Sequence, residues 1–260
     1  MISIRSLSIT YETSARSVPA VREVSLDIPA GKITAIVGES GGGKSSLVYG
    51  ILRLLPPEAS FSGSILYGRE NIVSASDAWI RNFRWKKAAL VTQGAMNSLT
   101  PVISVGSQIA EVLQVKMGLK RQEAMKRAGE LLEMTGLPAD YARRYPHELS
   151  GGQKQRAVIA MAMACSPDFL LADEPTSALD VITQAEVITT LAGMVRRRGM
   201  GLLLVTHDLP LAASICDTLA VMHRGRIVET GTPASILKSP SHSHTRELLS
   251  AYRVIGGQLQ

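Results

Sequence analysis

The sequence predicts an α/β fold with a mainly parallel core sheet, an N-terminal antiparallel β subdomain and an inserted helical subdomain. Three patterns support this prediction: short apolar segments that end at polar residues, an alternating N-terminal region, and a helical periodicity in the middle of the chain. The 260 residues, 45% of them hydrophobic, are enough to bury a sizeable core.

Apolar runs without alternation predict strands that are buried on both faces, as in a parallel sheet. Each run is followed by a glycine loop or by polar side chains. Ligands of such sheets bind beyond the carboxyl ends of the strands, so one shared site is expected there. The runs are Ile33–Val37, Ala88–Val91, Phe169–Ala172 and Leu202–Val205.

The remaining elements follow from local patterns. Residues 2–9 and 24–28 nearly alternate, as half-buried strands do, and Leu219–Glu229 is typical of a hairpin. Apolar residues recur at helical spacing between 124 and 132, and Gly136 to Pro138 should end that helix. The predicted boundaries are 1–94 with 157–232 for the core, 95–156 for the helical subdomain, and 233–260 for a tail of two short helices.

Composition narrows the function classes. The formal charge of +6 favours an anionic partner, but its densest basic runs are short and indicate solvated faces or helix ends. The longest apolar run, Ala157–Cys165, is shorter than the roughly 20 residues of a bilayer span, so no crossing is expected. Cys165 and Cys216 form no metal-binding spacing and indicate buried thiols in a reducing compartment.

A phosphate-binding loop is predicted at Gly38–Ser45, which fits G-x-x-x-x-G-K-[S/T] between a strand and a helix. Backbone N–H groups of such a loop point at phosphate oxygens, Lys44 should reach the β- and γ-phosphates, and Ser45 should bind Mg²⁺. A glycine-rich turn with an incidental lysine would lack this strand–loop–helix context. The expected ATP contacts are Gly38, Glu39, Ser40, Gly41, Gly42, Gly43, Lys44, Ser45 and Ser46.

Two carboxylates follow the apolar run at 169–172. Asp173 is placed to hold Mg²⁺, directly or through water. Glu174 can accept a proton from the attacking water. A pair of surface acids at a strand end is the alternative, and the upstream phosphate loop argues against it.

The segment Leu149–Gln153 reads LSGGQ, and here the chain resembles the ATP-binding-cassette (ABC) ATPases over nearly its whole length. The resemblance implies an ABC nucleotide-binding domain with a RecA-like core, in which two cassettes enclose two ATP molecules head to tail. The signature residues would then contact the γ-phosphate held by a partner, at a helix that Ser150 is suited to cap. These residues are Ser150, Gly151, Gly152 and Gln153, and Asp180 resembles the residue that joins the two cassettes.

The resemblance implies further roles. Gln93 would contact Mg²⁺ and the attacking water, and would report the nucleotide state to the helical subdomain. His207 would bond the γ-phosphate and orient water or Glu174. Tyr11 lies where the family stacks an aromatic ring on adenine, with an exposed strand tyrosine as the competing interpretation.

Longer segments resemble the oligopeptide, dipeptide and nickel importer ATPases: 37–45, 93–101, 145–156 and 227–249. That resemblance implies a peripheral subunit on the cytoplasmic face of the inner membrane, which hydrolyses ATP to drive uptake. It further implies a second ATPase subunit, usually a different chain, two transmembrane permeases and an extracytoplasmic solute-binding protein. The solute stays open between peptides, nickel and metal chelates.

Several details depart from that family or stay open. Gly42 replaces a usual serine, Gly94 replaces a frequent acidic residue, and no cysteine-bearing extension is present, so no iron–sulfur cluster is expected. His242 and His244 could suggest a metal site, but a helix-start element is the simpler interpretation because no other ligands accompany them in sequence.

Two other classes share the cassette. A DNA-repair ATPase would need long heptad repeats between the phosphate loop and the signature, and none is present, so no nucleic-acid partner is expected. A transporter-like ATPase in a non-transport assembly, such as a phosphonate-metabolism complex, stays open as the alternative.

Overall fold

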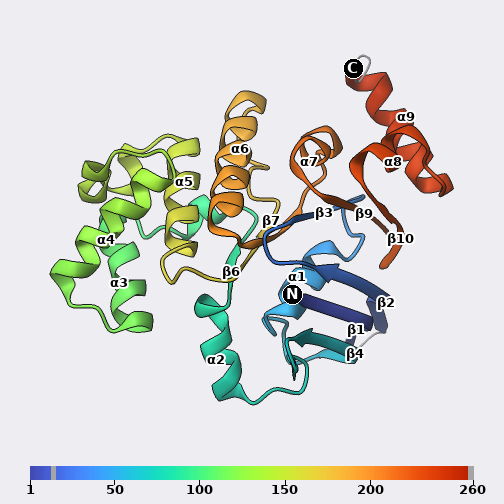
Figure 1. The fold of residues 1–260 in the computed structure, drawn as a ribbon, viewed down its shortest axis with the longest axis horizontal. Coiled ribbons are helices and arrows are strands. Elements are labelled where there is room, and N and C mark those ends of the chain that lie inside the picture. The colour runs from blue at the N-terminus through green and yellow to red at the C-terminus, as the bar shows by residue number, and fades with distance from the viewer. Residues whose placement is uncertain (13–15, 257–260) are drawn as a thin grey trace. The chain divides into compact units, whose positions relative to one another are not determined.

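The computed structural model describes residues 1–12 and 16–256. The chain forms two compact units, Met1–Ile80 with Gly201–Gln260 and Arg81–Met200, and helix α2 (Asp77–Lys86) crosses from the first to the second (Figure 1). The predicted boundaries at residues 94 and 156 divide the chain differently from these two units. They stay a prediction.

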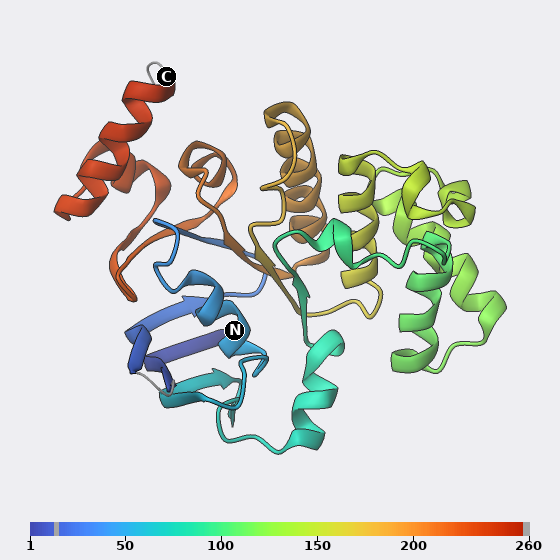
Figure 2. The ribbon, with the colours of Figure 1, turned by 180° about the vertical axis from the view of Figure 1, so that it is seen from behind.

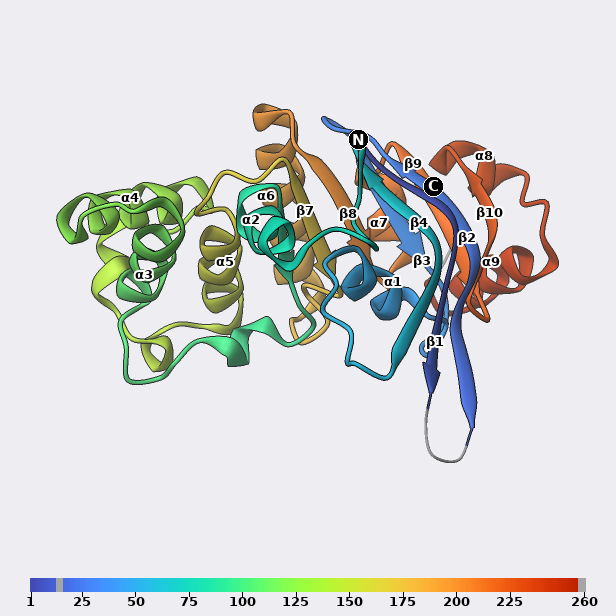
Figure 3. The same ribbon diagram turned by 90° about the horizontal axis from the view of Figure 1, so that it is seen from below.

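An antiparallel sheet forms the N-terminal part of the first unit. Strand β1 (Ile2–Glu12) lies between β2 (Ser17–Ile28) and β4 (Ala59–Tyr67), and β5 (Glu70–Asn71) continues the sheet (Figure 3). Alternation along β1 and β2 is broken by register shifts, and Ser6 and Glu23 have positive φ angles of 43° and 51°. Such bulges bend the strands and change which side chains face the core.

A mainly parallel sheet follows in the same unit. Strand β3 (Ile33–Val37) pairs in parallel with β8 (Gly201–Val205) on one side and with β9 (Thr218–His223) on the other. Strand β10 (Arg226–Gly231) pairs antiparallel with β9 and forms the expected hairpin. Every residue of β3 and β8 is buried, which is why their apolar runs show no alternation.

Helices α1 (Lys44–Ile51), α7 (Leu209–Ile215), α8 (Pro233–Lys238) and α9 (Ser243–Gly256) complete the first unit. The last two are the expected tail helices, and the final four residues of the predicted tail lie outside the described residues. The Glu229 carboxylate fixes the start of α9, because it accepts the Ser241 N–H at 2.8 Å and the His242 N–H at 3.1 Å. Burial acts to raise the pKa of Glu229, but these hydrogen bonds and the nearby Thr245 hydroxyl outweigh it and lower the pKa to about 2.

The second unit combines a parallel strand pair with a group of helices. Strands β6 (Ala88–Val91) and β7 (Phe169–Asp173) pair in parallel, as their apolar runs predict. Ala128, Leu131 and Leu132 are buried, which confirms the predicted apolar face of α4. The helical elements of the unit are η1 (Ala95–Ser98), α3 (Val105–Met117), α4 (Arg121–Met134), η2 (Ala139–Arg143), η3 (Pro146–Glu148), α5 (Gly151–Ala162) and α6 (Val181–Arg198) (Figure 2).

Both cysteines are buried, as expected. Burial raises the pKa of Cys165, and it raises the pKa of Cys216 to about 11, so neither thiol ionises readily near neutral pH. Among the described residues, none of the helices has the length and apolar character that a membrane crossing requires.

Candidate functional site

The phosphate loop follows β3 and is shaped by two glycines that no other residue could replace. Gly38 and Gly43 have φ angles of 153° and 96°, where side chains are rarely tolerated. A Cβ atom on Gly38 would lie 2.1 Å from the Met222 carbonyl oxygen, and one on Gly43 would lie 2.1 Å from that of Ala20. The loop therefore rests against the backbone of β9 and β2, and this close approach fixes its path.

Hydrogen bonds hold the same loop from within. The buried Lys44 ammonium donates to the Gly38 and Glu39 carbonyl oxygens, both at 2.8 Å. The Gly225 N–H, in the turn between β9 and β10, donates to the Gly42 carbonyl at 3.0 Å. The two bonds from Lys44 keep its positive charge inside the loop, where the charge would attract a phosphate group.

Helix α1 begins directly after the loop. Gly43 is its N-cap in a left-handed conformation, and no side chain caps the helix. Uncapped N–H groups at a helix N-terminus attract anions. Ser45 lies in this first turn, and the Tyr11 hydroxyl donates to the Ser46 Oγ at 3.0 Å, so the tyrosine of β1 reaches the helix that follows the loop.

His207 follows β8 in the same unit. Because β8 runs parallel to β3, their carboxyl ends meet at one edge, and His207 and the phosphate loop leave the sheet at that edge. The His207 side chain is exposed. Asp208 fixes the next element, since its carboxylate accepts the Leu211 N–H at 2.8 Å and caps α7.

The second unit brings Gln93 and Glu174 together. They follow the parallel strands β6 and β7, and the Gln93 Nε2 donates to the Glu174 Oε2 at 3.2 Å. Glu174 has a φ angle of 45°, a strained value of the kind that clusters at functional sites. Asp173, one residue earlier, is 1% exposed at the end of β7. Gly94 is the N-cap of η1 and has a φ angle of 65°, in the left-handed region that glycine adopts readily.

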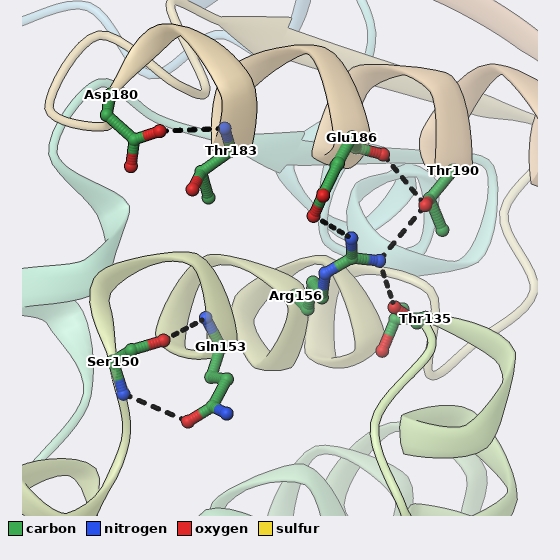
Figure 4. A network of polar contacts seen from close by, with 8 residues as sticks. All are labelled: Thr135, Ser150, Gln153, Arg156, Asp180, Thr183, Glu186 and Thr190. Carbon is green, nitrogen blue, oxygen red and sulfur yellow. Dashed lines mark hydrogen bonds and ion pairs between the residues drawn. The ribbon is translucent and has the colours of Figure 1, made fainter.

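The signature segment starts α5 with a capping box (Figure 4). Ser150 Oγ accepts the Gln153 N–H at 3.4 Å, and Gln153 Oε1 accepts the Ser150 N–H at 3.0 Å, so the predicted N-cap is confirmed. Gly152 allows close packing, because a Cβ there would lie 2.4 Å from the Thr183 Cγ2 of α6. The absence of a side chain at Gly152 therefore lets α5 pack against α6, in addition to any role in binding a ligand.

Asp180 is the N-cap of α6 and accepts the Thr183 N–H at 3.0 Å. Hydrogen bonds from the Thr183 backbone and hydroxyl lower the pKa of Asp180, so this carboxylate is ionised at neutral pH. The next two residues are apolar yet open to water, since Val181 is 78% and Ile182 is 74% exposed.

Arg156 is a residue that sequence reasoning missed. Its Nη1 donates to the Thr135 carbonyl at 2.9 Å and to the Thr190 Oγ1 at 3.0 Å, and its Nη2 lies 3.6 Å from a Glu186 carboxylate oxygen (Figure 4). One side chain of α5 thus joins the end of α4 to the middle of α6. No motif signals this role, because its partners lie 21 and 34 residues away in the chain.

The predicted site residues thus fall into two groups. The first unit carries Tyr11, His207 and Gly38 to Ser46, and the second carries Gln93, Asp173, Glu174, Ser150 to Gln153, and Asp180. Within each group the structure places them at strand ends or helix N-termini.

A phosphate loop on a parallel sheet, combined with a second helix whose N-terminus suits an anion, defines a nucleotide-binding cassette. Comparison with known proteins agrees. The model of the family described as ABC transporter matches residues 21–177. The dimeric structure of MJ0796, a bacterial ABC transporter cassette, superimposes with a TM-score of 0.79 at 29% identity and covers 90% of this chain and 99% of that one.

Curated relatives give the same result. OppD of Bacillus subtilis, an oligopeptide transport ATP-binding protein, is 40% identical over 96% of this chain and 71% of its own length. YejF of Agrobacterium fabrum, a peptidoglycan transport ATP-binding protein, is 41% identical over 96% of this chain, which spans 47% of YejF. The chain belongs to the ABC transporter family, as one of its ATP-binding cassettes. The predicted family and α/β fold class are confirmed.

Proposed function

We propose that the chain is the ATP-hydrolysing subunit of an importer for peptides. The observation that carries the proposal is the Glu174 carboxylate, held by Gln93 at a strand end, in a chain that also builds a phosphate loop around Lys44. Such a loop suits a nucleoside triphosphate, and the carboxylate suits activation of water. Names of relatives, such as the oligopeptide transport protein OppD, support peptides over nickel or metal chelates.

The nucleotide would bind at the phosphate loop. Lys44 would pair with the β- and γ-phosphates, the N–H groups from Gly38 to Ser46 would donate hydrogen bonds to phosphate oxygens, and Tyr11 would contact adenine. Mg²⁺ suits the donor set, because the Ser45 hydroxyl, the Asp173 carboxylate and the Gln93 amide offer the oxygen ligands it prefers. Bound there, the ion would neutralise charge on the β- and γ-phosphates.

Hydrolysis would depend on Glu174, Gln93 and His207, which follow strands β7, β6 and β8. Glu174 would accept a proton from the attacking water, as a carboxylate positioned by Gln93 at a strand end can act as a general base. Gln93 would orient that water. His207 would donate a hydrogen bond to a γ-phosphate oxygen and so stabilise the negative charge of the transferred phosphoryl group.

A second cassette would complete each site. Ser150, Gly151, Gly152 and Gln153 would present the capped N-terminus of α5 to the γ-phosphate bound by a partner, and Asp180 would join the two cassettes. The dimeric structures of MJ0796, one of them in a post-hydrolysis state bound to ADP and Pi, support this assembly. We propose two permeases and an extracytoplasmic binding protein as further partners, with the chain at the cytoplasmic face of the inner membrane.

The helical region at 95–156 would transmit nucleotide state to the permeases. It begins just after Gln93, whose side chain contacts Glu174. Coupling requires that ATP bind the closed dimer more tightly than the open one, because only a difference in affinity shifts an equilibrium.

Replacing Glu174 with Gln tests the proposal. The variant should bind ATP and form a stable dimer, but turnover should fall by at least about a hundredfold, as is typical when a general base is lost. Glu133→Gln, an exposed change on α4, is the matched control and should keep full turnover. Size-exclusion chromatography with ATP and a phosphate-release assay measure both properties, and full turnover in Glu174→Gln would refute the base assignment.

A further inference from the structure

Three side chains of metal-ligating types lie close together in the first unit, and the proposed reaction does not use them as metal ligands. They are Glu39 in the phosphate loop, His223 at the end of β9, and His244 in the first turn of α9. The two imidazole rings lie 3.7 Å apart between centroids, and the Glu39 Oε2 lies 3.9 Å from the His223 Nδ1. One ligand atom from each residue falls within 4.8 Å of the others.

One nitrogen atom of each imidazole is buried at this cluster without a hydrogen-bond partner. His244 is 5% exposed, and its Nε2 has no hydrogen-bond partner. The His223 Nδ1 is likewise buried without one. A buried polar atom left without a partner destabilises the fold, so two such atoms in one cluster favour a bound ligand. A neutral imidazole has a lone pair on one nitrogen atom, and this is the form that binds metal ions.

We propose that Glu39, His223 and His244 bind one divalent cation of the zinc class. Two imidazole nitrogens and one carboxylate oxygen form a borderline donor set that suits Zn²⁺, Ni²⁺ or Co²⁺ and disfavours Mg²⁺ and Ca²⁺. Zinc–ligand bonds of about 2.0–2.2 Å require the donors to close in by about 1 Å. The Glu39 side chain is 65% exposed and free to move inward.

Surrounding residues support the arrangement. The His244 Nδ1 lies 3.9 Å from the Glu247 carboxylate, which can orient the ring as carboxylates do for metal-bound histidines. His242 has a different role, because its Nδ1 accepts the His244 backbone N–H at 3.2 Å and so fixes the start of α9. The helix-start interpretation therefore describes His242, while His244 belongs to the cluster.

A bound cation would join segments that lie far apart in the chain. Glu39 belongs to the loop that Lys44 holds, and His244 belongs to the tail helix α9. The metal would tie that helix to the loop and protect it from local unfolding. This inference does not depend on the proposed hydrolysis.

Titration of the metal-free chain with Zn²⁺ against a chromophoric chelator tests the proposal, with Co²⁺ absorption as a report on coordination geometry. We expect one equivalent to bind with a dissociation constant of roughly 10 μM or tighter. Glu39→Gln and His223→Gln should each weaken binding by at least about tenfold. Because His244 is buried and its replacement could unfold the chain, the exposed Glu39 provides the decisive variant.

His147→Gln is the control, since His147 is exposed and belongs to the other unit. It should leave zinc affinity unchanged. Absence of binding at 100-fold above that concentration, equal affinity in wild type and both cluster variants, or an equal loss in His147→Gln would overturn the proposal.

Discussion

Replacing Arg156 with Met should loosen the packing of the signature helix. The Arg156 side chain is 17% exposed, and its guanidinium donates two hydrogen bonds, to the Thr135 carbonyl at 2.9 Å and to the Thr190 hydroxyl at 3.0 Å. Methionine fills part of the volume but donates nothing.

The magnitude follows from those contacts. A hydrogen bond from a charged donor contributes about 1.5–3 kcal/mol, and the Thr135 carbonyl belongs to a residue that is 1% exposed. Loss of the bond to Thr190 costs less, because the Thr190 hydroxyl keeps a partner by donating to the Glu186 carbonyl at 2.8 Å. The ion pair to the Glu186 carboxylate, whose side chain is 62% exposed, adds well under 1 kcal/mol. We therefore expect a local destabilisation of about 2–3 kcal/mol.

Native-state hydrogen exchange measures this effect by segment. Amide protection in α5 and α6 should fall about 30- to 140-fold, since each 1.4 kcal/mol is a factor of ten, while β3 and β8 should keep theirs. Arg197→Met on exposed α6 surface is the control and should cost only about 0.3–0.5 kcal/mol from the helix dipole. A change below about threefold in α5 and α6, or an equal change in the control, would refute the reasoning.

Three further changes test other contacts. Lys44→Ala should weaken MgATP binding by at least about a hundredfold in calorimetry, because it removes the charge inside the loop; retained affinity would contradict the phosphate role. Ser150→Ala should destabilise the first turn of α5 by about 1 kcal/mol, read by hydrogen exchange in that turn, and Ser250→Ala near the end of α9 should leave it unchanged. Glu229→Gln should lower thermal stability at pH 7 by on the order of 1 kcal/mol, a value reduced for solvent screening. The pKa of Glu229 is lowered to about 2 in the folded chain, so its contribution to stability is present above about pH 4.5 and is lost as the pH falls toward 2. The melting temperatures of wild type and Glu229→Gln should therefore converge near pH 2. A difference that persists at pH 2 would contradict this.

The buried strands could be predicted almost to the residue. Ile33–Val37 and Ala88–Val91 match β3 and β6, because a strand buried on both faces leaves a continuous apolar run between a polar start and a polar end. Motif spacing identified the phosphate loop and the Ser150 cap for a similar reason, since both depend on neighbours within a few residues.

Contacts between distant segments could not be predicted. Strand β2 begins at Ser17 rather than Val24, because bulges around Ser6 and Glu23 interrupt the alternation that marks a strand. The stacking of His223 on His244 joins positions on β9 and α9 that no periodicity relates. The contacts of Arg156 could not be predicted for the same reason, since the packing of the helices decides which carbonyl oxygen its side chain bonds.

The exposed apolar pair Val181 and Ile182 directly follows Asp180, the residue proposed to join two cassettes. Burying both side chains in each of two copies would contribute on the order of 6 kcal/mol. Bringing two proteins together costs about 4–15 kcal/mol in lost translational and rotational freedom. In the proposed dimer this apolar pair alone would therefore be too weak to keep the two cassettes closed, and the bound nucleotide would supply the remaining free energy. Such a contact would favour closure while nucleotide is bound and would let the cassettes separate after hydrolysis.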